Sequence, residues 1–122
     1  MIEFALSFLV FFTVVYGIME FSRIVASYNI LSGATREGAR YAIVHGSKSG
    51  SVATSTDIQN KVRGWAVGLD KSKVLVTTTW PTGNGPGGEV KVSTSYAISP
   101  FTKLILKSGL TLKSNSRMTI SQ

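Results

Sequence analysis

The first twenty residues contain the feature that most limits how this chain can fold. Residues 4–19 read FALSFLVFFTVVYGIM and include no charged side chain, while Glu3 precedes this run and Glu20 and Arg23 follow it. A segment that is apolar on all its faces is typical of a transmembrane helix rather than of an amphipathic surface helix. It is slightly shorter than the roughly 20 apolar residues that usually span a bilayer. This run predicts a membrane anchor.

The helical pattern continues beyond the anchor to about Val44. A helix of about 42 residues would be about 63 Å long, roughly twice the thickness of the hydrocarbon core of a bilayer. One half can therefore lie in lipid while the other half stands outside it. Ala34, Gly38 and Ala42 in the second half follow a small-xxx-small pattern, which predicts that another backbone approaches closely. The second half is amphipathic, with a stripe at helical spacing formed by Ile24, Tyr28, Leu31, Thr35, Gly38 and Ala42.

The charged residues are distributed unevenly. Lys and Arg number 13 against 6 Asp and Glu, a net charge of +7, and every basic residue lies at or beyond position 23. For an intact chain, the positive-inside rule would place the basic part in the cytoplasm. An apolar run that begins almost at residue 1 indicates instead that a short basic leader was removed. Both readings stay open on the residues alone. The basic excess is compatible with an anionic partner, but a solvated surface is the simpler explanation.

Residues 46–122 are predicted to form a small globular head, distinct from an N-terminal helix domain of residues 1–45. Thr56 and Gln59 fit a capping box, which opens a short amphipathic helix that stops near Gly68. The apolar stripe predicted to face the core of the head consists of Ile58, Val62, Trp65, Ala66 and Leu69.

Three strands are predicted to follow this helix. Residues 73–80, rich in Val and Thr, and residues 89–98, in which apolar and polar side chains alternate, are typical of strands. In residues 110–120 the apolar set of Leu110, Leu112, Met118 and Ile120 is diluted by serines. The clean alternation in the second strand indicates a sheet with one solvated face. The loop 81–88 is longer than a tight hairpin turn. Between the last two strands, residues 99–109 contain an exposed-looking Leu-Ile-Leu at 104–106 and read as an irregular crossover or a contact patch.

The sequence predicts no catalytic or metal site. The chain has no cysteine, which excludes disulfides and zinc-thiolate sites. His45, the single histidine, has no Cys, His or acidic cluster beside it. Asp57, Asp70 and Glu89 are far apart in the sequence. The loop GNGPGG lacks the Lys-Ser/Thr ending of a phosphate-binding loop, and the aromatic residues are not interleaved with basic ones as in a nucleic-acid platform. We therefore expect no enzyme activity, no cofactor and no nucleic-acid partner.

Several stretches resemble the TadE-like pseudopilins. EFAL at residues 3–6 and YGIMEFSR at 16–23 resemble the N-terminus of that family, and REGARYA at 36–42 is similar to its most recognisable stretch. Weaker similarity extends through residues 79–96 and 114–120, so that the resemblance covers nearly the whole chain.

The resemblance implies an α+β, type IV pilin-like subunit of a Tad/Flp-type system, with a long N-terminal helix, one short helix and a three-stranded antiparallel sheet. Such proteins lose a leader to a prepilin peptidase, reside in the inner membrane, and are assembled by the pilus machinery into an extracellular helical filament of identical subunits. The family implies that Glu3 pairs with the terminal amine of a neighbouring subunit. This acid stands two residues nearer the start than is usual in pilins, so either two residues are missing or the pairing geometry differs. The residues predicted to contact other subunits are Glu3, Phe4, Leu6, Phe8, Phe11, Phe12, Val15, Ile18, Ala34, Gly38 and Ala42.

Three roles are left open by the sequence. The first is a structural subunit, favoured because burying a large apolar side chain is worth about 1.5–3 kcal/mol, so that packing of residues 4–19 would dominate assembly while Glu3 sets the register. The second is a minor TadE-like pseudopilin that primes or caps a Tad/Flp pilus. The third, from another class, is a membrane-anchored binding module that uses its basic head and residues 104–106.

Overall fold

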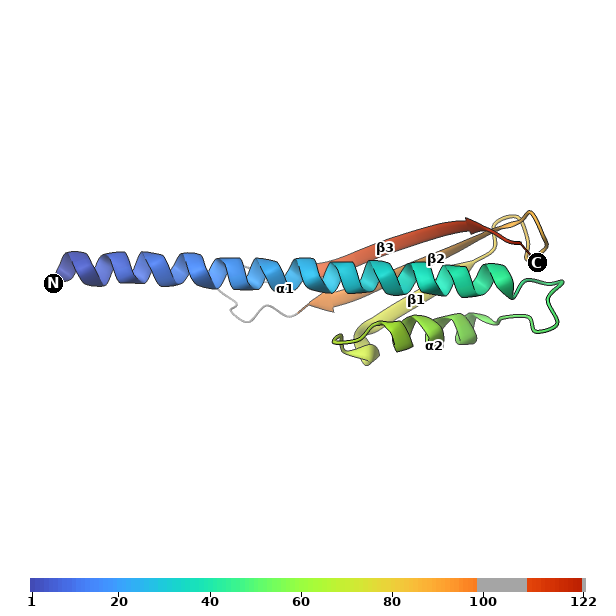
Figure 1. Ribbon diagram of the computed structural model, residues 1–122, viewed down its shortest axis with the longest axis horizontal. Helices are drawn as coiled ribbons and strands as arrows, with labels where there is room; N and C mark the ends of the chain where they lie inside the picture. Colours follow the sequence, from blue (N-terminus) through green and yellow to red (C-terminus); the bar gives the residue numbers. More distant parts are fainter. Residues whose placement is uncertain (99–109, 122) are drawn as a thin grey trace.

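One long helix runs the length of the molecule, and a small head packs along its C-terminal half (Figure 1). The computed structural model describes residues 1–98 and 110–121, so the contact patch predicted at residues 104–106 lies outside the described residues. The α+β layout confirms the predicted fold class. The elements are α1 (Ile2–Val44), α2 (Ser55–Trp65), a short 3₁₀ turn (Lys71–Lys73), β1 (Val74–Thr79), β2 (Glu89–Ile98) and β3 (Leu110–Thr119).

The three strands form one antiparallel sheet in the order β1-β2-β3. The period-2 pattern of β2 has the predicted consequence, because Val90, Val92 and Ile98 are buried while their odd-numbered neighbours are more exposed. Each strand pairs along its whole length, as in the alignment of Val76 with Thr94. The sheet therefore has one face toward the core and one toward solvent.

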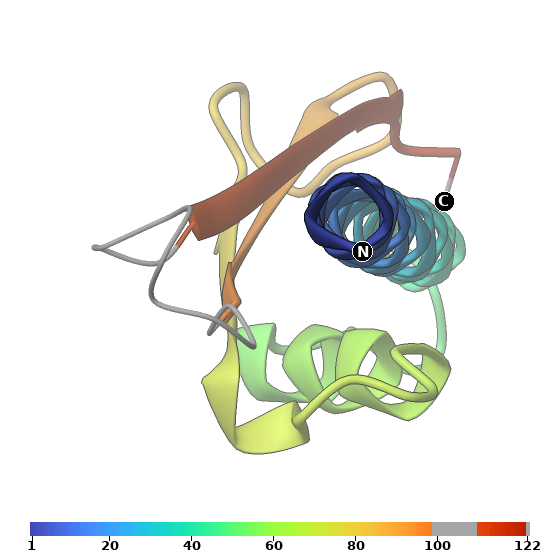
Figure 2. The ribbon, with the colours of Figure 1, turned by 90° about the vertical axis from the view of Figure 1, so that its left-hand side faces the viewer.

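The core lies between α1, α2 and the inner face of the sheet. In the view along α1, β2 and β3 pass over one side of the helix and α2 lies on the other side (Figure 2). Leu31 of α1, Ile58 and Val62 of α2, and Val90 and Val92 of β2 are fully buried there. The second half of α1 is thus a structural part of the head, although the helix itself ends one residue before the predicted domain boundary.

A polar contact inside this core links α1 to the sheet. The Thr35 hydroxyl donates a hydrogen bond to the Leu31 carbonyl oxygen at 2.7 Å, and its oxygen lies 2.6 Å from the Thr94 hydroxyl oxygen of β2. Both threonines are buried. Since a buried hydroxyl without a partner is costly, this pair favours one position of α1 over β2.

The start of α2 corrects the predicted capping box. Thr54 is the N-cap: its hydroxyl accepts from the Asp57 N–H at 3.2 Å, and the Asp57 carboxylate accepts from the Thr54 N–H at 3.0 Å. The box predicted at Thr56 and Gln59 was wrong by two residues, because a short Asp can reach back as Glu or Gln does in the usual pattern. The Thr54 backbone N–H, and then its hydroxyl, lower the pKa of Asp57.

The earlier start also changes which residues α2 buries. The helix ends at Trp65, so its apolar stripe is shorter than predicted. Ile58, Val62 and Ala66 are buried as expected, but 53% of Trp65 is exposed. Gly68 lies in the following turn with φ of +87°, a conformation that favours glycine.

Candidate assembly surface

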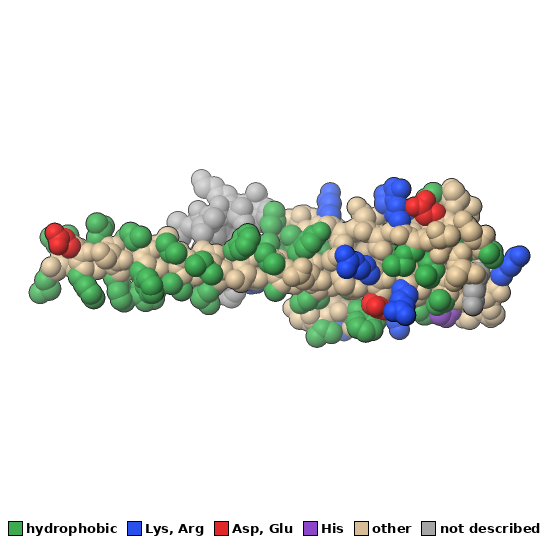
Figure 3. Space-filling view, turned by 45° about the horizontal axis from the view of Figure 1, so that its top comes forward, with side chains coloured by type: hydrophobic (Ala, Val, Ile, Leu, Met, Phe, Trp, Pro, Cys, Tyr) green, Lys and Arg blue, Asp and Glu red, His purple; other side chains and the backbone are tan. Residues whose placement is uncertain are grey.

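The N-terminal half of α1 extends away from the head and makes no core. Its most apolar 18-residue window has a mean hydropathy of 2.1, and none of this window is buried within the described chain. The helix is long and apolar enough to cross a membrane, judged by length and composition. Hydrophobic side chains cover this half of the rod, whereas Lys and Arg side chains gather on the head (Figure 3). Phe4, for example, is 75% exposed.

Aromatic rings form a row along this free half. Phe4, Phe8 and Phe12 follow at i,i+4 spacing, which places them on one side of a helix. The ring centroids of Phe4 and Phe8 are 6.0 Å apart, and those of Phe8 and Phe12 are 4.5 Å apart. Phe11 packs edge-on against Phe12 at 5.9 Å. The Thr13 hydroxyl donates to the Leu9 carbonyl oxygen at 2.8 Å, so this polar group is satisfied within the helix. The surface can therefore enter an apolar environment at little polar cost.

The free half of α1 also contains the other residues that were predicted there to contact neighbouring subunits. Leu6 and Ile18 are exposed, Val15 is partly exposed, and none of them belongs to the core. Glu3 lies in the first turn of α1, where the helix dipole favours an acidic side chain. Residues 3–18 are thus brought together on one continuous free surface.

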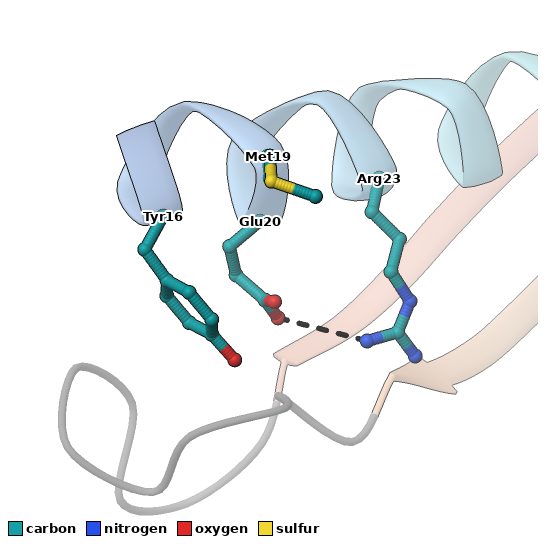
Figure 4. Close-up of a pocket in the computed structure, with 4 residues that line it drawn as sticks. All are labelled: Tyr16, Met19, Glu20 and Arg23. Atoms are coloured by element: carbon teal, nitrogen blue, oxygen red, sulfur yellow. Dashed lines mark ion pairs between the residues drawn. The ribbon is translucent and has the colours of Figure 1, made fainter. Parts of the chain in front are cut away.

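An ion pair marks the end of the uncharged segment. Glu20 is only 9% exposed and its carboxylate lies 3.7 Å from the Arg23 guanidinium, one turn along the helix (Figure 4). Tyr16 and Met19 line the same hollow. The uncharged residues 4–19 span about 24 Å, somewhat less than the roughly 30 Å of a hydrocarbon core. Glu3 and the Glu20–Arg23 pair therefore border a segment slightly shorter than a bilayer of ordinary thickness.

Three small residues that were predicted to contact other subunits lie inside the head: Ala34, Gly38 and Ala42. All three are buried in the core of the head. A Cβ at Gly38 would overlap the Cγ2 atom of Val62, so the absence of a side chain at position 38 makes room for a side chain of α2 in the same chain. The predicted contact of this pattern with another subunit stays a prediction. Their side chains therefore pack mainly within their own chain in this conformation.

Sequence reasoning missed an apolar surface beside the head. Trp65 and Val67 are 53% and 71% exposed at the end of α2. Helical spacing did not reveal it, because Trp65 lies seven residues after Ile58 and three after Val62 and so falls on the predicted buried stripe. The two residues border a shallow groove along α1 that is lined by Asn29, Ile30, Gly33, Ala34, Glu37, Trp65 and Val67.

His45 has a local structural role. Its Nδ1 atom lies 2.9 Å from the Tyr41 carbonyl oxygen, and its ring stacks on the Tyr41 ring at 4.1 Å. This contact holds the side chain against the last turn of α1.

Comparison with known proteins supports an assignment for the first third of the chain. No curated protein and no solved structure matches this chain. Residues 1–40 match the family model of the TadE-like proteins, which confirms the predicted resemblance for the free half of α1 and most of its packed half.

Proposed function

We propose that this chain is a structural subunit of a type IV pilus-like filament, in which the free halves of α1 from many copies pack together. One observation carries the proposal: the 18-residue apolar window of α1 is entirely unburied within the described chain. Burial of each large apolar side chain that is now exposed would stabilise the protein by about 1.5–3 kcal/mol. A bilayer and a bundle of identical helices both remove this exposure. The match of residues 1–40 to the TadE-like proteins supports involvement in a Tad pilus system.

The shape of the molecule fits a path from membrane to filament. The rod carries its head at one end (Figure 1), so packing of the free halves would leave the heads on the outside. In this proposal the chain is anchored in the inner membrane, processed by a prepilin peptidase, and drawn into an extracellular filament by the assembly machinery. Its role is structural, without catalysis, cofactor or nucleic-acid partner.

The first experiment is electron microscopy of sheared surface filaments combined with mass spectrometry of their subunits. A structural subunit should be the dominant protein of the filament fraction. Recovery only in traces, among filaments of another pilin, would identify a minor pseudopilin that primes or caps the pilus. Recovery only in the membrane fraction would contradict the filament proposal and favour an anchored binding module.

The second experiment tests the aromatic row. Phe8 contacts the rings on both sides of it, so Phe8→Ala should strongly reduce the yield of sheared filaments without changing the amount of subunit in the membrane. Leu75→Ala is the matched control, because Leu75 is also an exposed large apolar residue but lies on β1 of the head. Equal yields from the two variants would contradict packing through the free half of α1.

Glu3 is tested separately. If it pairs with a cation of a neighbouring subunit, Glu3→Ala should abolish or weaken assembly while the head remains folded, because Glu3 lies far along α1 from the core. Normal filaments from cells with Glu3→Ala would exclude the pairing role and leave the apolar packing untouched.

A further inference from the structure

The solvent-exposed face of the sheet presents a regular grid of side chains that are polar or basic except for Leu75. Successive residues of a strand point to opposite faces, and the odd-numbered residues of β1 and β3 are exposed. The antiparallel register aligns these residues across the three strands into rows. The rows are Thr79–Lys91–Arg117, Thr77–Ser93–Asn115 and Leu75–Ser95–Lys113.

This grid concentrates positive charge at a cost to the sheet. Lys91 and Arg117 are directly paired in the register, and like charges in such positions destabilise a sheet. Glu89, at the end of β2, offsets part of this cost through an ion pair with Arg117 at 3.8 Å. None of the residues in the three rows is acidic. A sheet face that keeps paired cations despite their repulsion indicates a use for the charge.

The net charge of the chain lies in the residues outside α1, which include this sheet. α1 carries three acidic and three basic residues, so the +7 of the chain comes entirely from the residues outside α1. The excess is therefore not a general property of the chain, nor of the membrane-proximal helix. It belongs to the part that would remain exposed if the free half of α1 were buried.

The spacing of the cations selects a linear polyanion. Lys113 and Arg117 are four residues apart on β3, which separates them by about 13 Å. A single carboxylate or phosphate group cannot contact both, whereas a chain with repeated acidic groups can. Between them, Thr77, Ser93 and Asn115 offer hydroxyl and amide groups that both donate and accept hydrogen bonds.

The grid ends in a shallow hollow of mixed chemistry. Its lining contains Thr82, Gly87, Glu89, Arg117, Met118 and Thr119. Glu89 can accept hydrogen bonds and Arg117 can donate them, which together suits the hydroxyl groups of a sugar ring. The Thr82 hydroxyl is fixed beside them because it accepts from the Glu89 N–H at 2.8 Å.

We propose that this face binds an acidic polysaccharide, with Lys91, Lys113 and Arg117 contacting its carboxylate groups. The hydroxyl row between them contacts the sugar hydroxyls. A single-stranded nucleic acid fits less well, because the three rows contain no aromatic side chain on which bases could stack. This binding is independent of the filament proposal, since it uses no residue of α1.

The test uses the full chain in detergent micelles and alginate, a linear polymer of uronic acids, as the probe. The triple variant Lys91→Gln, Lys113→Gln, Arg117→Gln should bind alginate at least about tenfold more weakly, because polyanion affinity depends on each neutralised charge. The matched control Lys48→Gln, Lys61→Gln, Lys71→Gln removes the same charge from residues outside the sheet. We expect it to bind within about threefold of the unchanged chain.

Two further measurements separate binding from folding. The sheet-face variant should unfold at about the same temperature as the unchanged chain, because it removes both the Lys91–Arg117 repulsion and the Glu89–Arg117 ion pair. The conservative variant Lys91→Arg, Lys113→Arg should retain affinity.

Three results would overturn the proposal. Equal losses in both triple variants would show attraction to net charge alone. Equally tight binding of neutral dextran would show that the cations are not used. Tighter binding of duplex DNA than of alginate would identify a nucleic acid as the partner.

Discussion

Two glycines in the packed half of α1 provide a matched test of how the helix contacts the head. A Cβ at Gly38 would overlap Cγ2 of Val62, and Cγ2 of Ile58 would lie 3.7 Å away. At Gly33, in the same helix, no atom of the described residues lies within 4 Å of the Cβ position. Gly→Ala therefore adds a methyl group to a filled space at position 38 and to an open space at position 33.

The two substitutions should have opposite effects on stability. Alanine is favoured over glycine in a helix interior by about 1 kcal/mol, so Gly33→Ala should raise the free energy of unfolding by about that amount. At position 38 the same gain is opposed by overpacking, which costs about 1–3 kcal/mol. Val62 cannot easily turn aside, because a β-branched residue in a helix has one strongly preferred rotamer. Gly38→Ala should therefore be less stable than Gly33→Ala by about 1–3 kcal/mol.

The measurement is urea unfolding of the full chain in detergent micelles, followed by tryptophan fluorescence. Trp80 packs partly buried against the core and reports on it. The double variant Gly38→Ala, Val62→Ala provides a second test, since removing the Val62 methyl groups makes room for the new one. It should be more stable than the sum of the two single changes predicts. If Gly38→Ala stabilised the chain as much as Gly33→Ala does, the packing of α1 on α2 described above would be wrong.

Three other changes test the head by the same unfolding assay. Thr54→Ala should cost about 1 kcal/mol because it removes the N-cap, whereas Thr56→Ala, outside the observed box, should stay within about 0.5 kcal/mol. Thr35→Val should lower the free energy of unfolding by about 1–3 kcal/mol, because the buried Thr94 hydroxyl then keeps a 3.4 Å contact to the Ser114 carbonyl oxygen but loses its Thr35 partner. The double variant Thr35→Val, Thr94→Val should recover most of that stability. The pKa of Asp57 is lowered in the folded state from an ordinary 3.8, so its contribution to stability is complete well above pH 3.8 and is lost as the pH falls through that value and below; Asp57→Asn should reduce this acid sensitivity.

Local periodicity explains why most of the fold was predictable. A long run of apolar, uncharged residues is compatible with few structures other than a transmembrane helix. The end of α1 was predicted at about Val44, where it is observed. The strands were predicted to within one residue at each end, because a period of two is read directly from neighbouring residues. The free half of α1 was identified for the same reason, since its chemistry does not depend on anything distant in the chain.

The remaining features depend on contacts that neighbours in sequence do not reveal. Gly38 indicates that a neighbour approaches α1 closely, but only the tertiary structure shows that this neighbour is the Val62 side chain of α2. Trp65 falls on the apolar stripe of a longer helix and is exposed in the shorter one. The cation pair of Lys91 and Arg117 arises from strand register, which links residues 26 positions apart. The sequence pattern therefore showed which residues make contacts, and the tertiary structure showed which residues they contact.

The two halves of α1 are helical for different reasons, and this difference has a functional consequence. The second half buries Leu31, Ala34 and Ala39 against its own head, so it is packed within a single chain. Within the described residues, the apolar window of the first half has no buried residue, and beyond the first turn its backbone N–H groups bond within the helix, which is a condition for entering lipid. A segment that is satisfied in a bilayer can leave it only for an equally apolar environment, which the proposed packing of identical segments would provide. Since none of the 18-residue apolar window is buried within the described residues, that change would require no refolding of the described head.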